Sequence, residues 1–328
     1  MHDKQESIPD RVLIIKEMIR RAYGKSGLEV SPLAFGGWPI AGVGWSNVNE
    51  RDSIATIRQA LDVGINLIDT AYMYGVNGES EILVGKAISG RREEAIVATK
   101  CGVHWENGEM VADSSPDRIR REVDESLRRL NIDVIDLYQV HSPDKKTPFE
   151  ETASVMASLI EEGKIRAVGV SNYSVEQMTS FSEVTPIHSL QPRYSMIDRK
   201  IENEIVPYCL QHRIGLCVYC PLERSLLTDR IKPAEDYPPE DDRRKDAGFK
   251  GEEYRRTKAM NDALRVIARE KGVTLAQLVL NWTVSQPGIT VAIVGATRPE
   301  QVTENAKALD FEIPAEEMGR INHIIAAR

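Results

Sequence analysis

The stretch RDSIATIRQALDVGINLIDT, residues 51–70, decides the fold of this chain. Its first part has the spacing of a helix with one buried face, formed by Ile54, Ile57, Leu61 and Val63. Its second part, INLIDT, is a short apolar run that is typical of a buried strand. The stretch therefore predicts an amphipathic helix that leads directly into a strand.

This alternation of helix and strand recurs along the chain. Strict alternation favours a parallel sheet, and eight units favour closure into a (β/α)8 barrel. An open dinucleotide-binding sheet would need G-x-G-x-x-G after its first strand, and the sequence has no such pattern. The eight strand-like runs are SPLAFGG (31–37), INLIDT (65–70), AIVATK (95–100), DLYQVH (136–141), RAVGVSN (166–172), HSLQPR (188–193), GLCVYCPL (215–222) and TVAIVG (290–295).

Segments outside the repeat complete the expected architecture. Residues 19–32 place a KSG turn within alternating residues, which predicts an N-terminal β-hairpin. Residues 223–258 form a long charged loop, for which a lid over the active face and a solvated insertion are both open. The helical pattern 297–309 follows the last strand and opens a C-terminal helical extension. We expect one α/β domain of the TIM-barrel class over 1–328, with residues 1–17 as an N-terminal extension.

Composition narrows the class of protein. The 328 residues are 41% hydrophobic and 28% charged, which is ordinary for a globular chain. The formal net charge of −8 argues against nucleic acid as a partner, but not against a small phosphorylated ligand held by local cations. No run approaches the length of a membrane span, and the apolar run 12–15 is too short for a secretory signal. We expect a cytoplasmic protein with no membrane partner.

Four cysteines, Cys101, Cys209, Cys217 and Cys220, are too few and too irregular for a disulfide framework. They suggest a reducing compartment. Cys217 and Cys220 form a C-x-x-C string that invites a redox or metal role. In a strand, however, positions three apart point to opposite faces. We interpret both as strand packing residues and expect no metal site.

Chemistry in such a barrel lies at the carboxyl ends of the strands. Each interpretation has a bland alternative: Asp69 as a turn cap, Tyr74 as aromatic packing, His141 as a hydrogen-bonded core histidine. A lysine at the barrel mouth, Lys100, must be paired or neutral. Their joint occurrence at neighbouring strand ends favours a functional site. The residues at the strand ends are Asp69, Thr70, Lys100, His141, Ser171, Asn172, Gln191, Tyr219 and Gly295.

The set Tyr74, Lys100, Asp69 and His141 forms a coherent acid–base group that needs no metal. Reduction of a carbonyl requires a proton for its oxygen, and a tyrosine hydroxyl can reach it, although its ordinary pKa is about 10. A nearby ammonium stabilises the tyrosinate and lowers that pKa, and an aspartate keeps the ammonium charged and placed. A histidine can orient the carbonyl oxygen and help at low pH.

The sequence resembles the aldo-keto reductase superfamily from about Arg21 to Ala308. Among its branches it looks most like bacterial reductases associated with inositol-catabolism operons, and more distantly like potassium-channel β-subunits. The motifs that carry the resemblance are YGKSGLEVSPLAFGGW, GINLIDTAYMYGVNGESEILVGKAI, IVATK, LYQVHSPD, GKIRAVGVSNYS, QPRYS, VYCPL and IVGATRPEQVTEN.

The resemblance places the family's catalytic tetrad on Asp69, Tyr74, Lys100 and His141. It implies a nicotinamide cofactor, and Arg298 facing a 2′-phosphate at a helix N-terminus favours NADP(H) over NAD(H). Trp38 and Trp105 would line the substrate pocket, where loop packing is the alternative for each. The residues that the resemblance assigns to the cofactor are Ser171, Asn172, Gln191, Tyr219, Pro221, Leu222, Gly295, Thr297, Arg298, Gln301, Glu304 and Asn305.

The segment after the seventh strand departs from the pattern S-P-L-x-x-G-L-L-T-G-K of many relatives. Ser225 and Asp229 replace glycines, and Cys220 replaces a serine. Glycines there let the backbone approach the cofactor's pyrophosphate, and an aspartate beside phosphate would be unfavourable unless it pointed away.

Three functions remain open. The leading one is an NADP(H)-dependent oxidoreductase that interconverts a small aldehyde, ketone or sugar with the alcohol, taking the proton from Tyr74. A second is a Schiff-base aldolase in which Lys100 is the nucleophile. A third is a non-catalytic or slow cofactor-sensing regulatory subunit. Substrate, direction and oligomeric state do not follow from the sequence.

Overall fold

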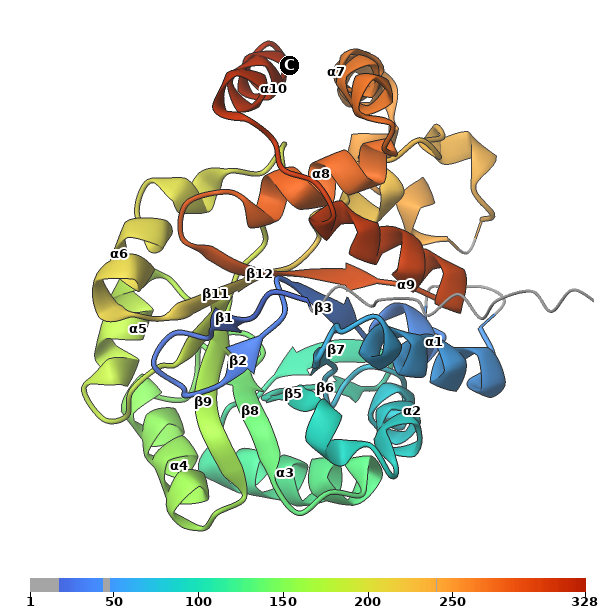
Figure 1. Ribbon diagram of the computed structural model, residues 1–328. Coiled ribbons are helices and arrows are strands. Elements are labelled where there is room, and N and C mark those ends of the chain that lie inside the picture. Colours follow the sequence, from blue (N-terminus) through green and yellow to red (C-terminus); the bar gives the residue numbers. More distant parts are fainter. Residues whose placement is uncertain (1–17, 44–47, 240) are drawn as a thin grey trace, which may run out of the picture.

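The computed structural model describes residues 18–43, 48–239 and 241–328. Eight parallel strands close into a barrel in the order β10-β11-β12-β3-β4-β5-β8-β9, which confirms the predicted (β/α)8 fold (Figure 1). Each predicted run overlaps one of them, with ends that differ by a few residues. The barrel strands are β3 (Leu33–Gly36), β4 (Leu67–Asp69), β5 (Ile96–Cys101), β8 (Ile135–Val140), β9 (Ile165–Ser171), β10 (Ser189–Gln191), β11 (Gly215–Val218) and β12 (Ile289–Gly295).

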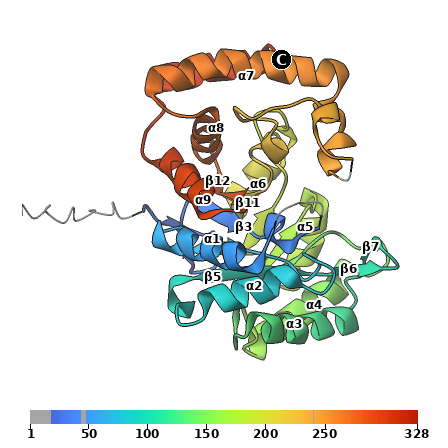
Figure 2. The same cartoon turned by 90° about the vertical axis from the view of Figure 1, so that its right-hand side faces the viewer.

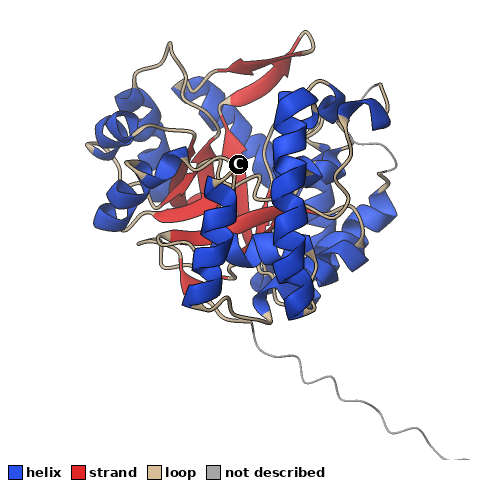
Figure 3. Cartoon of the chain, turned by 90° about the horizontal axis from the view of Figure 1, so that it is seen from above, coloured by secondary structure: helices blue, strands red, loops and turns tan. Residues whose placement is uncertain are grey.

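Helices cover the outside of the barrel (Figures 1 and 3). Local signals set their ends: the Asn49 side chain accepts from the Asp52 N–H at the start of α1, and α3 stops at Asn131, whose φ is 52°. The helices are α1 (Glu50–Asp62), α2 (Glu79–Ile88), α3 (Pro116–Leu130), α4 (Phe149–Glu161), α5 (Val175–Ser182), α6 (Ile205–His212), α7 (Gly251–Lys271), α8 (Leu275–Val284), α9 (Pro299–Ala306) and α10 (Ala315–Ala326).

Two apolar layers hold the barrel. The larger one lies between the strands and the surrounding helices and includes Trp282, which has no exposed surface. The smaller one fills the interior of the barrel with alternate residues of the strands, such as Leu67, Leu137 and Val291. Alternation along each strand serves both layers, so the barrel is a packed core rather than a pore.

The N-terminal hairpin is present as β1 (Arg21–Ala22) and β2 (Glu29–Val30), paired antiparallel. The buried Tyr23 hydroxyl lies 2.7 Å from Ser189 Oγ of the barrel. Gly24 has φ +58°, and a Cβ there would come within 2.5 Å of the Gly215 backbone nitrogen. Glycine at this position therefore allows the hairpin to lie directly against the barrel strands.

A second hairpin was not predicted from the sequence. Strands β6 (Val103–Glu106) and β7 (Glu109–Ala112) pair antiparallel and project from one end of the barrel (Figure 2). Asn107 and Gly108 form the turn with φ values of 51° and 83°, as a type I′ turn requires. The Asn-Gly pair was the sequence signal that could have found it.

The loop predicted over residues 223–258 is shorter than expected. Its last residues belong to α7, which begins at Gly251 because Glu252 and Glu253 suit a helix N-terminus and good helix formers follow. The remainder contains the 3-10 turns Glu223–Ser225, Ala234–Asp236, Asp242–Arg244 and Ala247–Phe249. A small apolar cluster of Leu226, Ala234, Tyr237 and Phe249 anchors it, so it is more than a solvated insertion.

The C-terminal helical extension is confirmed as α10, which lies beside α7 outside the barrel (Figures 1 and 3). The predicted N-terminal extension, residues 1–17, lies outside the described residues. Within the described ranges, no helix has both the length and the apolar character needed to cross a membrane.

Candidate active site

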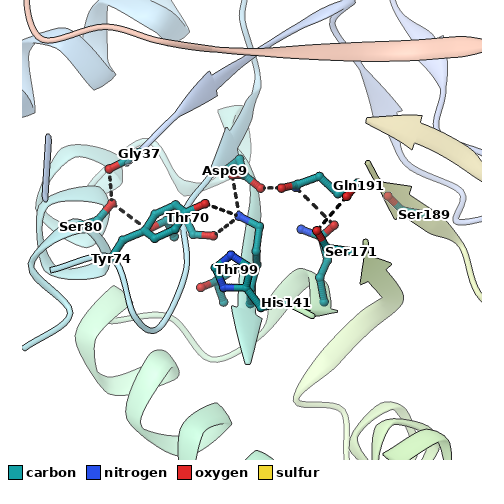
Figure 4. A network of polar contacts seen from close by, with 12 residues as sticks. Gly37, Asp69, Thr70, Tyr74, Ser80, Thr99, His141, Ser171, Ser189 and Gln191 are labelled. Carbon is teal, nitrogen blue, oxygen red and sulfur yellow. Dashed lines mark hydrogen bonds and ion pairs between the residues drawn. The ribbon is translucent and has the colours of Figure 1, made fainter. Parts of the chain in front are cut away.

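Three neighbouring strands bring the four predicted acid–base residues together (Figure 4). Asp69 ends β4, Lys100 lies near the end of β5, and His141 directly follows β8. Lys100 Nζ lies 2.7 Å from Asp69 Oδ2, 2.9 Å from the Thr70 carbonyl oxygen and 3.2 Å from the Tyr74 hydroxyl. Asp69 and Lys100 are buried, whereas Tyr74 and His141 are half-buried at the mouth. The arrangement aims one ammonium at one tyrosine hydroxyl.

Burial decides the protonation state of Tyr74. Desolvation raises the pKa of the Tyr74 hydroxyl, and this outweighs the opposing effect of the Lys100 charge. The expectation that the ammonium would bring the pKa of Tyr74 below its ordinary value was therefore wrong in its net sign. Burial alone would lower the pKa of Lys100, but Asp69 and Tyr74 raise it above its ordinary value. Tyr74 is thus a protonated donor beside a fixed positive charge.

His141 is a neutral imidazole at neutral pH. Burial, followed by the Lys100 charge, lowers its pKa to about 3. Its ring lies edge-on to that of Tyr74, with centroids 5.7 Å apart. Its Nδ1 is buried without a hydrogen-bond partner among the described residues. The predicted help at low pH would need an imidazolium, so His141 can act near neutrality only as a neutral hydrogen-bonding group.

Aromatic side chains border Tyr74. The Trp38 ring stands edge-on to Tyr74 with centroids 5.0 Å apart. Trp105 comes from the β6–β7 hairpin, and its Nε1 donates to the Met73 carbonyl oxygen at 2.9 Å. Both tryptophans are half-buried, so each packs against its neighbours and keeps part of its side chain exposed.

The other half of the barrel mouth carries amide side chains. Gln191 Nε2 donates to Asp69 Oδ1 at 2.8 Å, and the Ser171 hydroxyl donates to the Gln191 carbonyl oxygen at 2.7 Å. Asn172 is exposed with φ +62°, and its Oδ1 accepts from the Tyr219 hydroxyl at 2.9 Å. These four residues from β9, β10 and the end of β11 form one connected polar wall.

The residues after β12 form a helix N-terminus with an available cation. Gly295 is exposed at the strand end, Arg298 is the N-cap of α9, and Pro299 occupies its first position. The Thr297 N–H donates to Gln301 Oε1 at 2.8 Å, which orders this turn. The exposed Arg298 guanidinium has no ion-pair or hydrogen-bond partner among the described residues. Glu304 and Asn305 follow on the same helix.

The start of α9 carries groups of the kind that bind phosphate. Free N–H groups at a helix N-terminus and an unpaired guanidinium are the groups that bind phosphate in proteins. The unpartnered His141 Nδ1 and the exposed Asn172 amide mark a polar face at the mouth. Pro221 and Leu222 follow β11, so along the chain they lie between the amide wall and the start of α9. Pro221 is buried and Leu222 is half-buried.

The two residues that replace glycines behave differently. Ser225 has φ +78°, a conformation that glycine adopts without strain. Asp229 points away toward the helices: it accepts from Arg265 Nε and from the Leu275 N–H of α8, both at 3.0 Å. Its charge is therefore neutralised by a helix N-terminus and an arginine.

A buried carboxylate in the same segment was not singled out from the sequence. Glu223 is 5% exposed, accepts from the Ser195 hydroxyl at 2.6 Å and pairs with Arg193. Arg193 and Ser195 follow β10, so these contacts tie the start of the long segment after β11 to the neighbouring strand end. No local pattern distinguishes it from the exposed acids nearby.

The interpretation of both C-x-x-C cysteines as strand residues was half right. Cys217 is buried inside the barrel on β11, but the strand ends at Val218 and Cys220 lies beyond it with φ +59°. Both are free thiols, and burial raises the pKa of Cys220 to about 11. Among the residues that the structure describes, no cluster of His, Cys, Asp and Glu suits a metal ion.

Comparison with known proteins agrees with this geometry. The Aldo/keto reductase family model matches residues 32–326. The aldo-keto reductase YhdN of Bacillus subtilis is 40% identical over 303 residues, 92% of this chain and 91% of that protein. The NADH-specific methylglyoxal reductase of Escherichia coli is 36% identical over 306 residues, 88% of this chain and 93% of that protein. The structure of a glycerol dehydrogenase, AKR11B4 from Gluconobacter oxydans, superposes with a TM-score of 0.85 at 38% identity, covering 92% and 93% of the two chains.

The closed parallel barrel and the family match together define a nicotinamide-dependent oxidoreductase that acts on carbonyls or alcohols. The chain belongs to the aldo/keto reductase family.

Proposed function

We propose that this protein is an NADP(H)-dependent enzyme that interconverts a small aldehyde, ketone or sugar with its alcohol, with Tyr74 as the proton donor. The observation that carries the proposal is the buried Asp69–Lys100 pair, whose ammonium contacts the Tyr74 hydroxyl at 3.2 Å. A raised Tyr74 pKa keeps the hydroxyl protonated, as reduction requires.

Each residue has a distinct role in this proposal. The bound nicotinamide supplies or takes the hydride at the carbonyl carbon. Tyr74 gives its proton to the carbonyl oxygen, and the positive charge of Lys100 stabilises the tyrosinate that remains. Asp69 holds Lys100 charged and in place. Neutral His141 donates or accepts a hydrogen bond that orients the carbonyl, and Trp38 and Trp105 border the substrate.

Arg298 supports NADP(H) as the preferred cofactor. Its guanidinium is unpaired within the described residues, and Arg298 is the N-cap residue of α9, so a 2′-phosphate would meet positive charge at a helix N-terminus. Ser171, Asn172, Gln191 and Tyr219 would hold the nicotinamide end. Thr297, Gln301, Glu304 and Asn305 would hold the adenosine end, with Pro221, Leu222 and Gly295 lying between. The E. coli relative is named NADH-specific, so the preference needs a direct measurement.

The Schiff-base alternative has little support in the geometry. A lysine nucleophile must be a neutral amine, whereas Asp69 at 2.7 Å keeps the pKa of Lys100 above its ordinary value. A cofactor-sensing subunit would bind cofactor without turnover. We expect the protein to work in a reducing compartment such as the cytoplasm, because its described cysteines are all free thiols.

The test is titration with NADPH and NADH, followed by turnover on a panel of probes. The panel is methylglyoxal, benzaldehyde and glucose with the reduced or oxidised cofactors, and glycerol with NADP⁺ and NAD⁺. Turnover on any member supports the proposal, and a preference for NADPH that Arg298→Ala abolishes supports the cofactor assignment. Saturable binding with no turnover on any probe supports the sensing subunit instead. Incorporation of substrate into protein by borohydride would support the aldolase.

A further inference from the structure

Helix α3 places a carboxylate against the end of β5, the strand that carries Lys100 of the proposed active site. Glu122 has no exposed surface. Its Oε2 accepts a hydrogen bond from the Gly102 N–H at 2.7 Å, and its Oε1 accepts from Arg118 Nε at 2.6 Å. Gly102 is the residue that follows the end of β5, two positions after Lys100.

The peptide group between Cys101 and Gly102 links this carboxylate to His141. Its N–H donates to Glu122, and its carbonyl oxygen accepts from the backbone N–H of His141 at 2.9 Å. The peptide is a planar, rigid unit, so the two hydrogen bonds act on one body. A charged acceptor on the N–H also polarises the carbonyl and strengthens the hydrogen bond that the His141 backbone N–H donates to it.

Gly102 also holds the hairpin that carries Trp105. The Gly102 carbonyl oxygen accepts from the Asp113 N–H at 3.0 Å, which closes the base of the β6–β7 hairpin. Gly102 has φ +78°, and a Cβ on it would lie 2.8 Å from Ser114 Oγ. Within this hairpin, the Trp105 indole N–H donates to the carbonyl oxygen of Met73, the residue before Tyr74.

We propose that Glu122 is a positioning residue that sets the placement of His141 and of the Trp105 hairpin through the Cys101–Gly102 peptide. The proposal rests on the function proposed above, in which His141 orients the carbonyl and Trp105 borders the substrate. Glu122 touches neither substrate nor cofactor. It acts only through the peptide that it binds.

The surroundings make the charge of Glu122 responsive to pH. Burial raises its pKa to about 7, opposed by the Gly102 hydrogen bond and Arg118 and reinforced by Glu81. The titratable groups that face it are Arg118 on α3, Glu81 on α2, Tyr72 after β4, Cys101 on β5 and Tyr138 on β8. Ionised Glu122 is the stronger acceptor for the Gly102 N–H, so the hydrogen bond between them strengthens as pH rises through neutrality.

The experiment compares Glu122→Ala, Glu122→Gln and the matched control Asp124→Asn. Glutamine keeps an acceptor for the Gly102 N–H but cannot ionise, whereas alanine removes the acceptor. Asp124 is also on α3, but its side chain is 54% exposed and pairs with Lys164 at the surface. Each variant is assayed for kcat and KM with the best carbonyl of the panel from pH 5.5 to 9. Amide hydrogen exchange of peptides covering 101–112 is measured in parallel.

We expect Glu122→Ala to raise KM roughly tenfold or more and to speed exchange in 101–112, since small misplacements in a site are costly. Glu122→Gln should restore most of the wild-type KM and exchange protection at neutral pH. The wild-type KM should fall as pH rises through about 7, and this step should be missing in Glu122→Gln. Asp124→Asn should match the wild type.

Unchanged KM and unchanged hairpin exchange in Glu122→Ala would overturn the proposal. Exchange that rises uniformly over the whole chain would also overturn it, because that result marks a merely structural residue. Failure of the proposed function gives a different pattern, with Tyr74→Phe turning over as fast as the wild type. If no panel carbonyl is reduced, hydrogen exchange alone decides whether Glu122 holds the hairpin.

Discussion

The Lys100 ammonium donates to the Tyr74 hydroxyl at 3.2 Å while it lies 4.7 Å from the centroid of the Tyr74 ring. The charge is thus placed to favour the tyrosinate, yet burial keeps the neutral hydroxyl as the resting form. A group of this kind gives up its proton only when negative charge develops on a partner, such as a carbonyl oxygen that receives a hydride.

Tyr74→Phe removes only the transferable proton. We expect kcat to fall by a factor of about 10² to 10⁴, the usual contribution of a general acid. Affinity for NADPH should be unchanged in fluorescence titration. Tyr208→Phe, a change on α6 where the ring stacks on His212, is the control and should keep wild-type turnover. Wild-type kcat in the Tyr74 variant would contradict the mechanism.

The raised pKa of Tyr74 predicts different pH profiles for the two directions. Reduction needs the protonated hydroxyl, so its kcat should stay level through neutral pH and fall only above the ordinary tyrosine pKa of about 10. Alcohol oxidation needs tyrosinate, so it should rise steadily toward alkaline pH. Steady-state assays in both directions check this. Because the pKa of His141 is about 3, an inflection of the reductive kcat near pH 6.5 that His141→Gln removes would be contrary.

Lys100→Met should destabilise the fold as well as abolish turnover. Removing one partner of a buried ion pair leaves the Asp69 charge uncompensated, which costs about 3–5 kcal/mol. The double variant Asp69→Asn with Lys100→Met should recover much of that loss, because no isolated charge remains. Urea unfolding measures both. A double variant less stable than the single one would show that the pair contributes little beyond packing.

Ser225→Gly should stabilise the protein. Its φ of +78° strains a serine but not a glycine, and the relief is expected to exceed the entropic cost of glycine by roughly 0.5–1 kcal/mol. The matched change Ser154→Gly in the exposed interior of α4 should lose roughly 0.5 kcal/mol. Thermal unfolding of both variants tests the prediction. Equal losses at the two sites would disprove strain at Ser225.

Glu122→Gln should change how stability depends on pH. The pKa of Glu122 is raised from 4.5 to about 7 in the folded protein, so the folded state binds more protons than the unfolded state between these values. Its contribution to stability is therefore present below pH 4.5 and lost as pH rises through about 7, by roughly 3 kcal/mol in all. The free energy of unfolding of Glu122→Gln should gain on the wild type between pH 5 and pH 8. A constant difference would contradict the raised pKa.

The barrel and the tetrad could be predicted because they follow from local patterns. Apolar runs located each strand, and polar residues at the strand ends gathered at one mouth by topology alone, as with Lys100 and His141. The β6–β7 hairpin was missed because its strands are short and only one of their residues, Val103, is buried, which leaves the Asn107–Gly108 turn as the signal.

The electrostatics of the site could not be predicted, because burial depends on the whole fold. The sequence predicted that Lys100 would lower the pKa of Tyr74, but desolvation is the larger effect. Glu122 lies three residues after Ile119 and four before Ser126, so helical spacing alone places it on the buried face. What it binds there, the Gly102 N–H, depends on how α3 packs against β5.

The hydrogen bond from Gln191 to Asp69 crosses the barrel, since β10 and β4 are four strands apart in either direction round the ring. It joins opposite walls of the barrel, with the Gln191 amide at one end and Asp69, the counter-ion of Lys100, at the other. A ligand that accepted a hydrogen bond from the Gln191 amide in place of Asp69 would leave the Asp69 carboxylate with Lys100 as its main partner. Because Asp69 bonds to both Gln191 and Lys100, binding at the β10 wall would alter the charge environment of Tyr74 at the β4 wall.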